Sequence, residues 1–189
     1  MYYHIIKSPI YPILLAGDEK GLKHLIFLKD ERKAKIPNDW VENKDFFREV
    51  SNQLEAYFSG KLKTFDVKLA PQGTEFQKSV WKALCEIPCG ETRTYGEIAK
   101  RIQNPKAYRA VGLANNRNPI AIIVPCHRVI GANGKLTGYA SGLDIKEFLL
   151  KLEENNVTIQ PLIKKYVFSA KCCNSQDNSG APLSAARIA

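Results

Sequence analysis

Residues 94–115 read TYGEIAKRIQNPKAYRAVGLAN, and this stretch decides the fold of the chain around it. A helix is expected to start near Thr94, with apolar residues at Ile98, Ala99 and Ile102. The Asn104–Pro105 pair ends that helix, because proline cannot continue it, and a second short helix follows from about Ala107 to Asn115. Two short helices joined by a tight turn predict a helix-turn-helix motif, although a simple pair of packed helices has the same pattern.

The second of these helices has an unusually flat surface. Its small residues are Ala107, Ala110, Gly112 and Ala114, and Arg109 stands among them. A DNA duplex could approach such a backbone closely, but the same residues would also allow close helix packing. The chain of 189 residues carries a formal net charge of +9. That charge favours a polyanionic partner, and the alternative is a basic surface that is merely solvated.

Upstream of this motif, the sequence predicts an antiparallel sheet followed by a helix. Strand-like runs cover residues 2–6, 13–16 and 22–28, and the last two are joined by a turn at Gly17 to Gly21. Apolar residues then recur at helical spacing from Phe46 to Phe58, and residues 65–69 are expected to return as another strand. Because Pro71 to Gly73 marks a boundary, we expect an amino-terminal α+β domain at residues 1–72.

The second domain is expected to span residues 73–156. Thr74 and Gln77 form the pattern of a capping box that opens a helix. Downstream of the helix pair, the apolar run from Ile120 to Val124 predicts a buried strand or extended segment, and a hairpin or wing follows it. An amphipathic helix is expected from Leu143 to Asn155. Residues 157–189 form a carboxyl-terminal extension that we expect to be disordered from about residue 169, because it is too polar to bury a core.

Cys126 is the candidate nucleophile, because a cysteine reacts as its thiolate and needs a base or a positive charge to form it. His127 follows it directly. Neighbouring residues in an extended segment point to opposite sides, so the imidazole would act through a bridging water or, given a turn, by direct contact. Glu153 is one of several carboxylates that could hold the histidine tautomer. The alternative interpretation is a small buried cysteine beside an exposed basic pair.

Neither a metal nor a cofactor is predicted. Cys85 and Cys89 are only loosely spaced, the histidines are scattered along the chain, and there is no glycine-rich phosphate loop. The odd number of cysteines, five, and the lack of a signal peptide favour a reducing, cytoplasmic setting. No apolar run approaches the roughly 20 residues needed to cross a bilayer, so no membrane partner is expected.

Residues Pro125 to Val129, with the sequence PCHRV, resemble the motif of the O6-alkylguanine-DNA alkyltransferases, also called methylated-DNA–protein-cysteine methyltransferases. The resemblance extends from Thr74 to Glu153, whereas the amino-terminal domain is similar only in general layout. Its other matching segments are Thr94 to Ala99, Arg109 to Gly112, Asn118-Pro119, Gly138-Tyr139 and Gly142-Leu143.

The resemblance implies an α+β fold, with a ribonuclease H-like antiparallel sheet plus helix in the first domain and a winged helix-turn-helix in the second. It implies a cytoplasmic monomer, associated with the nucleoid when bound, that binds double-stranded DNA containing alkylated guanine through the minor groove. The protein would flip the damaged base out of the duplex. Cys126 would then take the alkyl group from O6-alkylguanine, and from O4-alkylthymine, in a single irreversible turnover.

The same resemblance assigns roles to individual residues. His127 would be the water-mediated base, Glu153 its partner, and Asn118 the residue that holds the turn before the active site. Arg109, with Ala110 beside it, would contact DNA and take the place of the extruded base. The residues expected to line the guanine pocket are Tyr95, Val129, Tyr139 and Ala140.

Single use follows from the product, since no group in the chain can cleave a thioether, and alkylation is expected to destabilise the fold. Parts of the sequence are also compatible with three other functions. A non-catalytic relative would lack the acceptor, but Cys126 is present. A helix-turn-helix transcription factor is disfavoured by the cysteine motif behind the helices. A cysteine hydrolase would be excluded by a lack of activity on esters and peptides.

Overall fold

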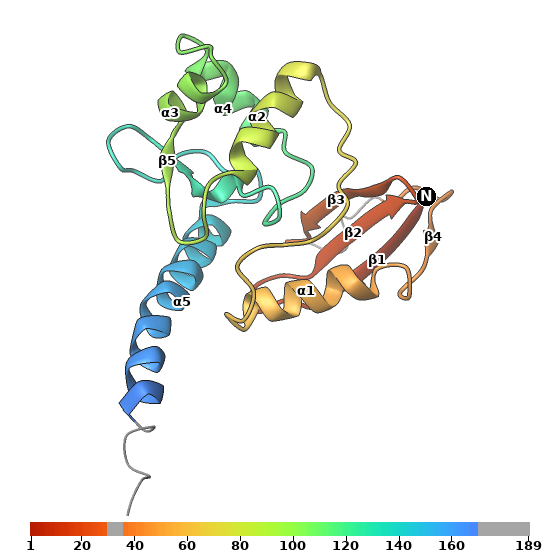
Figure 1. The fold of residues 1–189 in the computed structure, drawn as a ribbon. Coiled ribbons are helices and arrows are strands. Elements are labelled where there is room, and N and C mark those ends of the chain that lie inside the picture. Colours follow the sequence, from red (N-terminus) through yellow and green to blue (C-terminus); the bar gives the residue numbers. More distant parts are fainter. Residues whose placement is uncertain (30–35, 170–189) are drawn as a thin grey trace, which may run out of the picture. The chain divides into compact units, whose positions relative to one another are not determined.

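A four-stranded sheet forms the amino-terminal part of the computed structural model, which describes residues 1–29 and 36–169 (Figure 1). The strand order is β3-β2-β1-β4, with bounds β1 (Tyr2–Ile6), β2 (Ile13–Asp18), β3 (Gly21–Phe27) and β4 (Val41–Glu42). The first three strands pair antiparallel, as predicted. The short β4 pairs parallel with β1 and was not predicted. Two residues are too short a run to give a readable alternation.

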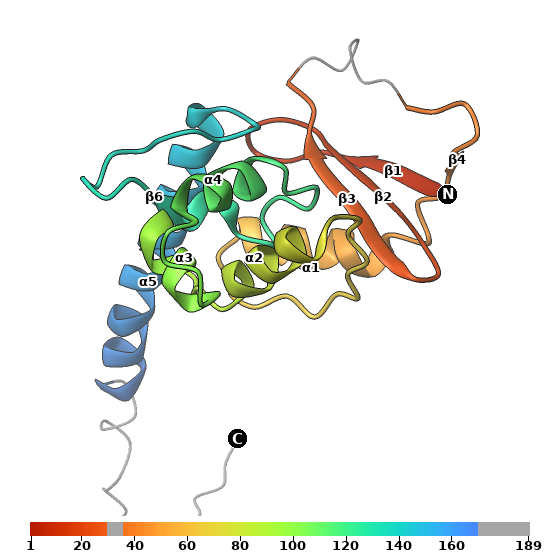
Figure 2. The same ribbon diagram turned by 90° about the horizontal axis from the view of Figure 1, so that it is seen from above.

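Helix α1 (Arg48–Phe58) follows the sheet and lies along it in both ribbon views (Figures 1 and 2). Its buried side chains are Leu54 and Tyr57. The predicted strand at residues 65–69 is wrong. Only one bridge forms there, between Leu69 and Leu22, because the side-chain amide of Gln53 takes both backbone groups of Asp66.

The predicted helix-turn-helix is confirmed by α3 (Tyr95–Arg101) and α4 (Tyr108–Asn116), which lie together beside α2 (Glu75–Cys85) in Figure 2. The capping box of Thr74 and Gln77 opens α2 with both of its hydrogen bonds. An equivalent box opens α3. Gly112 faces the Tyr95 ring, and a Cβ added there would lie 3.9 Å from it, at ordinary contact distance.

Residues 120–124 are buried except for the partly buried Ile123, but the strand predicted for them is wrong. Ile120 bridges to Leu25 in β3, and the backbone then folds into tight turns in which Ile122 takes a φ of 67°. The side chain of Asn118 holds this shape, since its Oδ1 accepts from the Ile120 N–H and its Nδ2 donates to the Val124 carbonyl. An apolar run alone does not distinguish a buried strand from a buried turn.

The active-site segment follows as a short 3-10 helix, η2 (Cys126–Arg128), and then β6 (Val129–Ile130), which pairs parallel with β5 (Arg93–Thr94). Residues 131–142 contain a turn closed by Gly131 and Lys135 instead of the expected hairpin. Helix α5 (Leu143–Ser169) buries Ile145 and Leu149 as predicted, and it continues well past Asn155. The disorder predicted beyond residue 169 falls on residues outside the described part of the chain.

Candidate active site

Cys126 is the first residue of η2, and its side chain is only 5% exposed. Its sulfur accepts a hydrogen bond from Asn118 Nδ2 at 3.0 Å, and its carbonyl accepts one from the buried Asn115 amide at 3.3 Å. Both asparagines belong to the end of α4 and the turn after it. The helix-turn-helix and the cysteine are therefore joined by direct polar contacts.

The carboxylate of Glu153 is the common hydrogen-bond acceptor for the polar groups around His127. This carboxylate is fully buried on α5, and Oε1 lies 2.8 Å from His127 Nε2. Arg128 donates to both carboxylate oxygens, each at 2.9 Å, and also to the Ile87 carbonyl at 2.6 Å. The Gly90 N–H and the Tyr57 hydroxyl complete the set, at 3.1 and 2.7 Å. Five donor atoms from four residues, in three separate parts of the chain, thus hold one carboxylate.

Charges in this cluster are set by burial and by pairing. Burial alone would raise the pKa of Glu153, but His127 and the permanently charged Arg128 hold it well below its usual range. Burial lowers the pKa of His127 and outweighs the opposing effect of Glu153. The histidine is therefore neutral near neutral pH. Its Nδ1 atom is buried and has no hydrogen-bond partner within the described residues, so it is available to accept a proton.

The thiol of Cys126 is protonated at rest. Burial raises its pKa, while the hydrogen bond from Asn118 lowers it and so favours the thiolate. Lys146 lies on the same side of α5 as Glu153 and is fully buried. Its ammonium donates to the carbonyls of Val129 and Thr137 at 2.6 and 2.9 Å, and burial lowers its pKa to about 8.

Two of the residues predicted to line the guanine pocket connect to this ammonium, Val129 through its carbonyl and Tyr95 through the shared Thr137 carbonyl. Val129 is buried and Tyr139 is 9% exposed, and Tyr95 donates its hydroxyl to the Thr137 carbonyl at 3.2 Å. The Tyr139 hydroxyl is buried without a regular hydrogen-bond partner in the described ranges. Ala140 differs from the others, since it is exposed.

The two residues predicted to contact DNA lie outside this cluster, on the solvent face of α4. Arg109 and Ala110 are exposed, and the Arg109 guanidinium lies 5.7 Å from the Tyr108 ring centre. Leu113, one turn further along, is 63% exposed. The outer surface of α4 therefore combines a cation, small residues and an uncovered apolar side chain.

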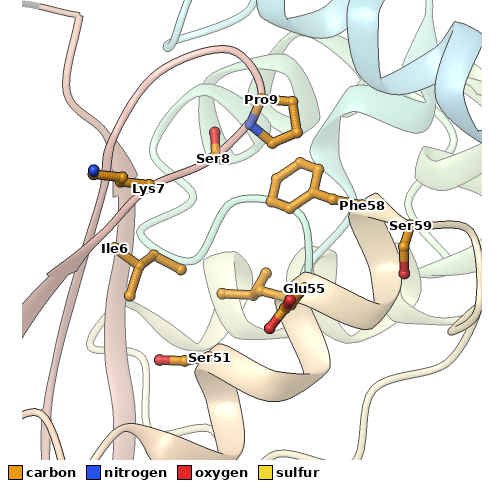
Figure 3. Close-up of a pocket in the computed structure, with 9 residues that line it drawn as sticks. Ile6, Lys7, Ser8, Pro9, Ser51, Glu55, Phe58 and Ser59 are labelled. Atoms are coloured by element: carbon orange, nitrogen blue, oxygen red, sulfur yellow. The ribbon is translucent and has the colours of Figure 1, made fainter.

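Elsewhere in the described chain we find no comparable cluster of buried, hydrogen-bonded polar side chains. Cys85 and Cys89 are free, and burial raises the pKa of both thiols. Within the described ranges no group of three or more potential metal ligands occurs. None of the helices described is long and apolar enough to cross a bilayer. A pocket of about 490 Å³ opens between the end of β1 and α1, where Figure 3 shows Pro9 beside Phe58. The two charged residues of its lining, Lys7 and Glu55, are exposed, in contrast to the buried charges around Glu153.

Several residues of the cluster were missed by the sequence analysis. Arg128 belongs to the recognised motif, but nothing in its sequence position predicts a contact with Glu153. Lys146 had a readable signal, because a lysine three residues before Leu149 falls on the inward face of the predicted helix. Tyr57 and Gly90 had none. They are 96 and 63 residues away from Glu153, and only the tertiary fold brings them to it.

The fold and the site together define a helix-turn-helix protein with a buried cysteine beside a histidine–glutamate pair. Residues 1–71 match the family model described as "6-O-methylguanine DNA methyltransferase, ribonuclease-like domain". Residues 75–155 match the one described as "6-O-methylguanine DNA methyltransferase, DNA binding domain".

Similar proteins carry a related name. A methylated-DNA–protein-cysteine methyltransferase from Methanosarcina mazei is 99% identical over 157 residues, which are 83% of this chain and 99% of the relative. One from Mycobacterium tuberculosis is 53% identical over 155 residues, or 82% and 93% of the two chains. The crystal structure of M. tuberculosis OGT in complex with DNA superposes with a TM-score of 0.77 at 52% identity, covering 82% of this chain and 94% of that one. The chain therefore belongs to the 6-O-methylguanine DNA methyltransferase family, and the predicted family and fold class are confirmed.

Proposed function

We propose that this chain repairs DNA by moving an alkyl group from the O6 atom of a guanine onto the sulfur of Cys126. The single observation that carries this proposal is the environment of the buried Cys126 sulfur. The sulfur accepts a hydrogen bond from Asn118, and the next residue, His127, is held by Glu153 through its Nε2 atom. Family membership supports the same reaction. O4-alkylthymine is a second substrate that the same displacement would accept.

The chemical step is an in-line displacement at the alkyl carbon. His127 takes the Cys126 proton through a bridging water at its free Nδ1, and Glu153 stabilises the imidazolium that forms. The thiolate then forms a bond to the alkyl carbon while the bond from that carbon to O6 breaks, and its electron pair passes to the guanine. A donor that protonates the departing base makes it a better leaving group. The thioether is permanent, so each molecule acts once.

Pocket and duplex contacts complete the proposal. The flipped base occupies a space lined by Tyr95, Val129 and Tyr139. Ala140 contacts the base through the backbone of its exposed loop. Asn118 keeps the turn that places the sulfur. On the outer face of α4, Arg109 fills the position of the extruded base, and Ala110 allows the duplex to approach in the minor groove.

Arg109 provides a test of the duplex surface. Because an intercalated cation stabilises the flipped state, Arg109→Ala should slow repair of duplex DNA far more than reaction with the free modified base. Arg48→Ala is the matched control, since Arg48 is also exposed but lies on α1. Equal losses on both substrates, or similar losses in both variants, would argue against this surface.

The domain limits, assembly state and location are part of the proposal. We assign residues 1–72 to the amino-terminal domain, 73–156 to the alkyltransferase domain and 157–189 to an extension; the matched ranges 1–71 and 75–155 support the first two. The protein acts as a cytoplasmic monomer that joins the nucleoid when it binds DNA. Light scattering of the free protein and its duplex complex tests the monomer.

The deciding experiment uses a duplex with one O6-methylguanine labelled on its methyl group. Intact-mass analysis and peptide mapping should find one methyl group per molecule, on Cys126, and none in Cys126→Ala. Cys85→Ala and Cys89→Ala are the controls, and both should transfer normally. Binding of the duplex without transfer would instead favour a lesion-sensing or regulatory DNA-binding protein.

A further inference from the structure

Tyr57 reaches the active site from the other domain. It lies in the last turn of α1, and its hydroxyl donates to Glu153 Oε1 at 2.7 Å across 96 residues of sequence. Both side chains are buried, with exposures of 1% and 0%. Because Oε1 is also the oxygen 2.8 Å from His127 Nε2, the tyrosine and the histidine share one acceptor atom.

The surroundings of Tyr57 hold its ring firmly. The rings of Phe58 and Phe65 lie 5.4 Å from it, in edge-on and tilted arrangements. A phenylalanine would fill the same space and make the same ring contacts, since the two side chains differ only in the hydroxyl. The hydroxyl has one hydrogen-bond partner among the described residues, and that partner is Glu153. Its contribution is therefore to the carboxylate.

Tyr57 and Arg128 constrain the carboxylate in different ways. Arg128 binds both oxygens and so sets the plane of the group, as a bidentate pair does. Tyr57 binds only Oε1, the oxygen that His127 also uses. Since Arg128 Nη2 also donates to Oε1, the buried hydroxyl of Tyr57 restricts the direction from which the imidazole ring can meet that atom.

We propose that Tyr57 is a positioning residue for alkyl transfer: its hydroxyl fixes the Glu153 oxygen that orients His127, so the amino-terminal domain contributes a group to the active site. This inference rests on the proposed function of Cys126 and His127. It gives the amino-terminal domain a part in the chemical step, in addition to its packing.

The test compares two tyrosines in the full-length chain. Tyr11 also donates to a carboxylate of α5, but to the exposed Asp144, at 3.3 Å. Tyr57→Phe and Tyr11→Phe therefore remove similar bonds between the same two regions, only one of which touches the site. Single-turnover transfer from an O6-methylguanine duplex gives the rate constant, and fluorescence anisotropy with an unmodified duplex gives the Kd.

We expect Tyr57→Phe to lower the transfer rate constant by about tenfold, the size of a lost hydrogen bond to a charged group, with an unchanged Kd. Tyr11→Phe should match the parent in both. In a Glu153→Gln background, Tyr57→Phe should cause little further loss, because its effect passes through the ionised carboxylate. A fluorotyrosine at position 57, which keeps the ring and its hydroxyl but strengthens the donor, should also change the rate constant.

Each other outcome overturns a specific statement. Parental rates in Tyr57→Phe and in the fluorotyrosine protein would remove the positioning role and leave Tyr57 as a packing residue. A full additional loss in the Glu153→Gln background would mean that Tyr57 does not act through Glu153. If the parental protein itself transfers no methyl group, the proposed function fails, and that failure is distinct from the failure of the Tyr57 proposal.

Discussion

The side-chain amide of Asn118 binds the sulfur of Cys126 and the backbone turn before it with the same nitrogen. Nδ2 lies 3.0 Å from the sulfur, 2.8 Å from the Val124 carbonyl and 3.2 Å from the Ile120 carbonyl. An amide nitrogen has only two protons for these three acceptors. A change at the sulfur therefore alters the hydrogen bonds of the turn, and a change in the turn alters the sulfur.

Asn118→Ala should impair both stability and reaction. It leaves the Ile120 N–H without its hydrogen-bond partner and removes one of the two donors to each of the Ile120 and Val124 carbonyls, which should lower the free energy of unfolding by about 2 kcal/mol. It also removes the donor that favours the thiolate, so alkyl transfer should slow. Urea denaturation and single-turnover kinetics measure the two effects. Asn116→Ala, at the exposed end of α4, is the control, and comparable behaviour of the two variants would refute this role for Asn118.

Methylation of Cys126 should destabilise the protein. The sulfur lies in a site that is 5% exposed, so an added methyl group must displace neighbours, and Asn118 loses a favourable acceptor. Overpacking of this kind should lower the melting temperature by about 5 °C. Calorimetry of the parent after stoichiometric reaction, beside Cys126→Ala exposed to the same duplex, measures it. An unchanged melting temperature in the reacted parent would show that the site accommodates the methyl group.

Local patterns predicted the helices well and the irregular segments poorly. The capping box at Thr74 and the Asn104–Pro105 turn are short-range signals, and α2, α3 and α4 formed where they indicated. Residues 65–69 looked like a strand because apolar and charged residues alternate there, and residues 120–124 looked like one because all five are apolar. The side chain of Gln53 hydrogen-bonds the backbone of the first segment, and the side chain of Asn118 hydrogen-bonds the backbone of the second. No pattern within either segment reveals these partners.

The residues of the candidate site likewise fall into those that the sequence predicted and those that it did not. The Cys126 motif and the inward face of the last helix were readable from the sequence, and the structure places Glu153 Oε1 2.8 Å from His127 Nε2. The sequence left several carboxylates open for that pairing, because spacing alone does not place the end of one helix against a 3-10 turn. Tyr57 was expected only as a core residue, since nothing near it in sequence distinguishes a buried hydroxyl with a charged partner from one without.

Arg128 should matter more for stability than any exposed ion pair. Arg128→Met leaves the Glu153 carboxylate buried with its main counter-charge gone, which should cost about 3–5 kcal/mol of folding free energy. Lys151→Met breaks the exposed pair with Glu147 on the same helix and should cost about 0.5 kcal/mol or less. Chemical denaturation of both variants beside the parent makes the comparison. Similar losses would mean that the buried pair is far weaker than its geometry indicates.

Lys146 should make stability depend on pH in the alkaline range. Its pKa falls from a usual 10.5 to about 8 in the folded protein, because burial disfavours the ammonium. Between these values the unfolded chain binds a proton that the folded chain does not. This lysine's contribution therefore favours folding most above pH 10.5, weakens as the pH falls towards 8, and is constant below that. Lys146→Met lacks this dependence.

The free energy of unfolding of Lys146→Met, measured relative to the parent, should therefore rise as the pH falls through the same window. It should then stay level below pH 8. Urea denaturation of both proteins under reducing conditions, at a series of pH values across the window, provides the two curves. Groups other than Lys146 titrate in both proteins and largely cancel in the difference. A difference that is flat from pH 8 to 10.5 would show that the buried ammonium keeps its ordinary pKa, held by the carbonyls of Val129 and Thr137.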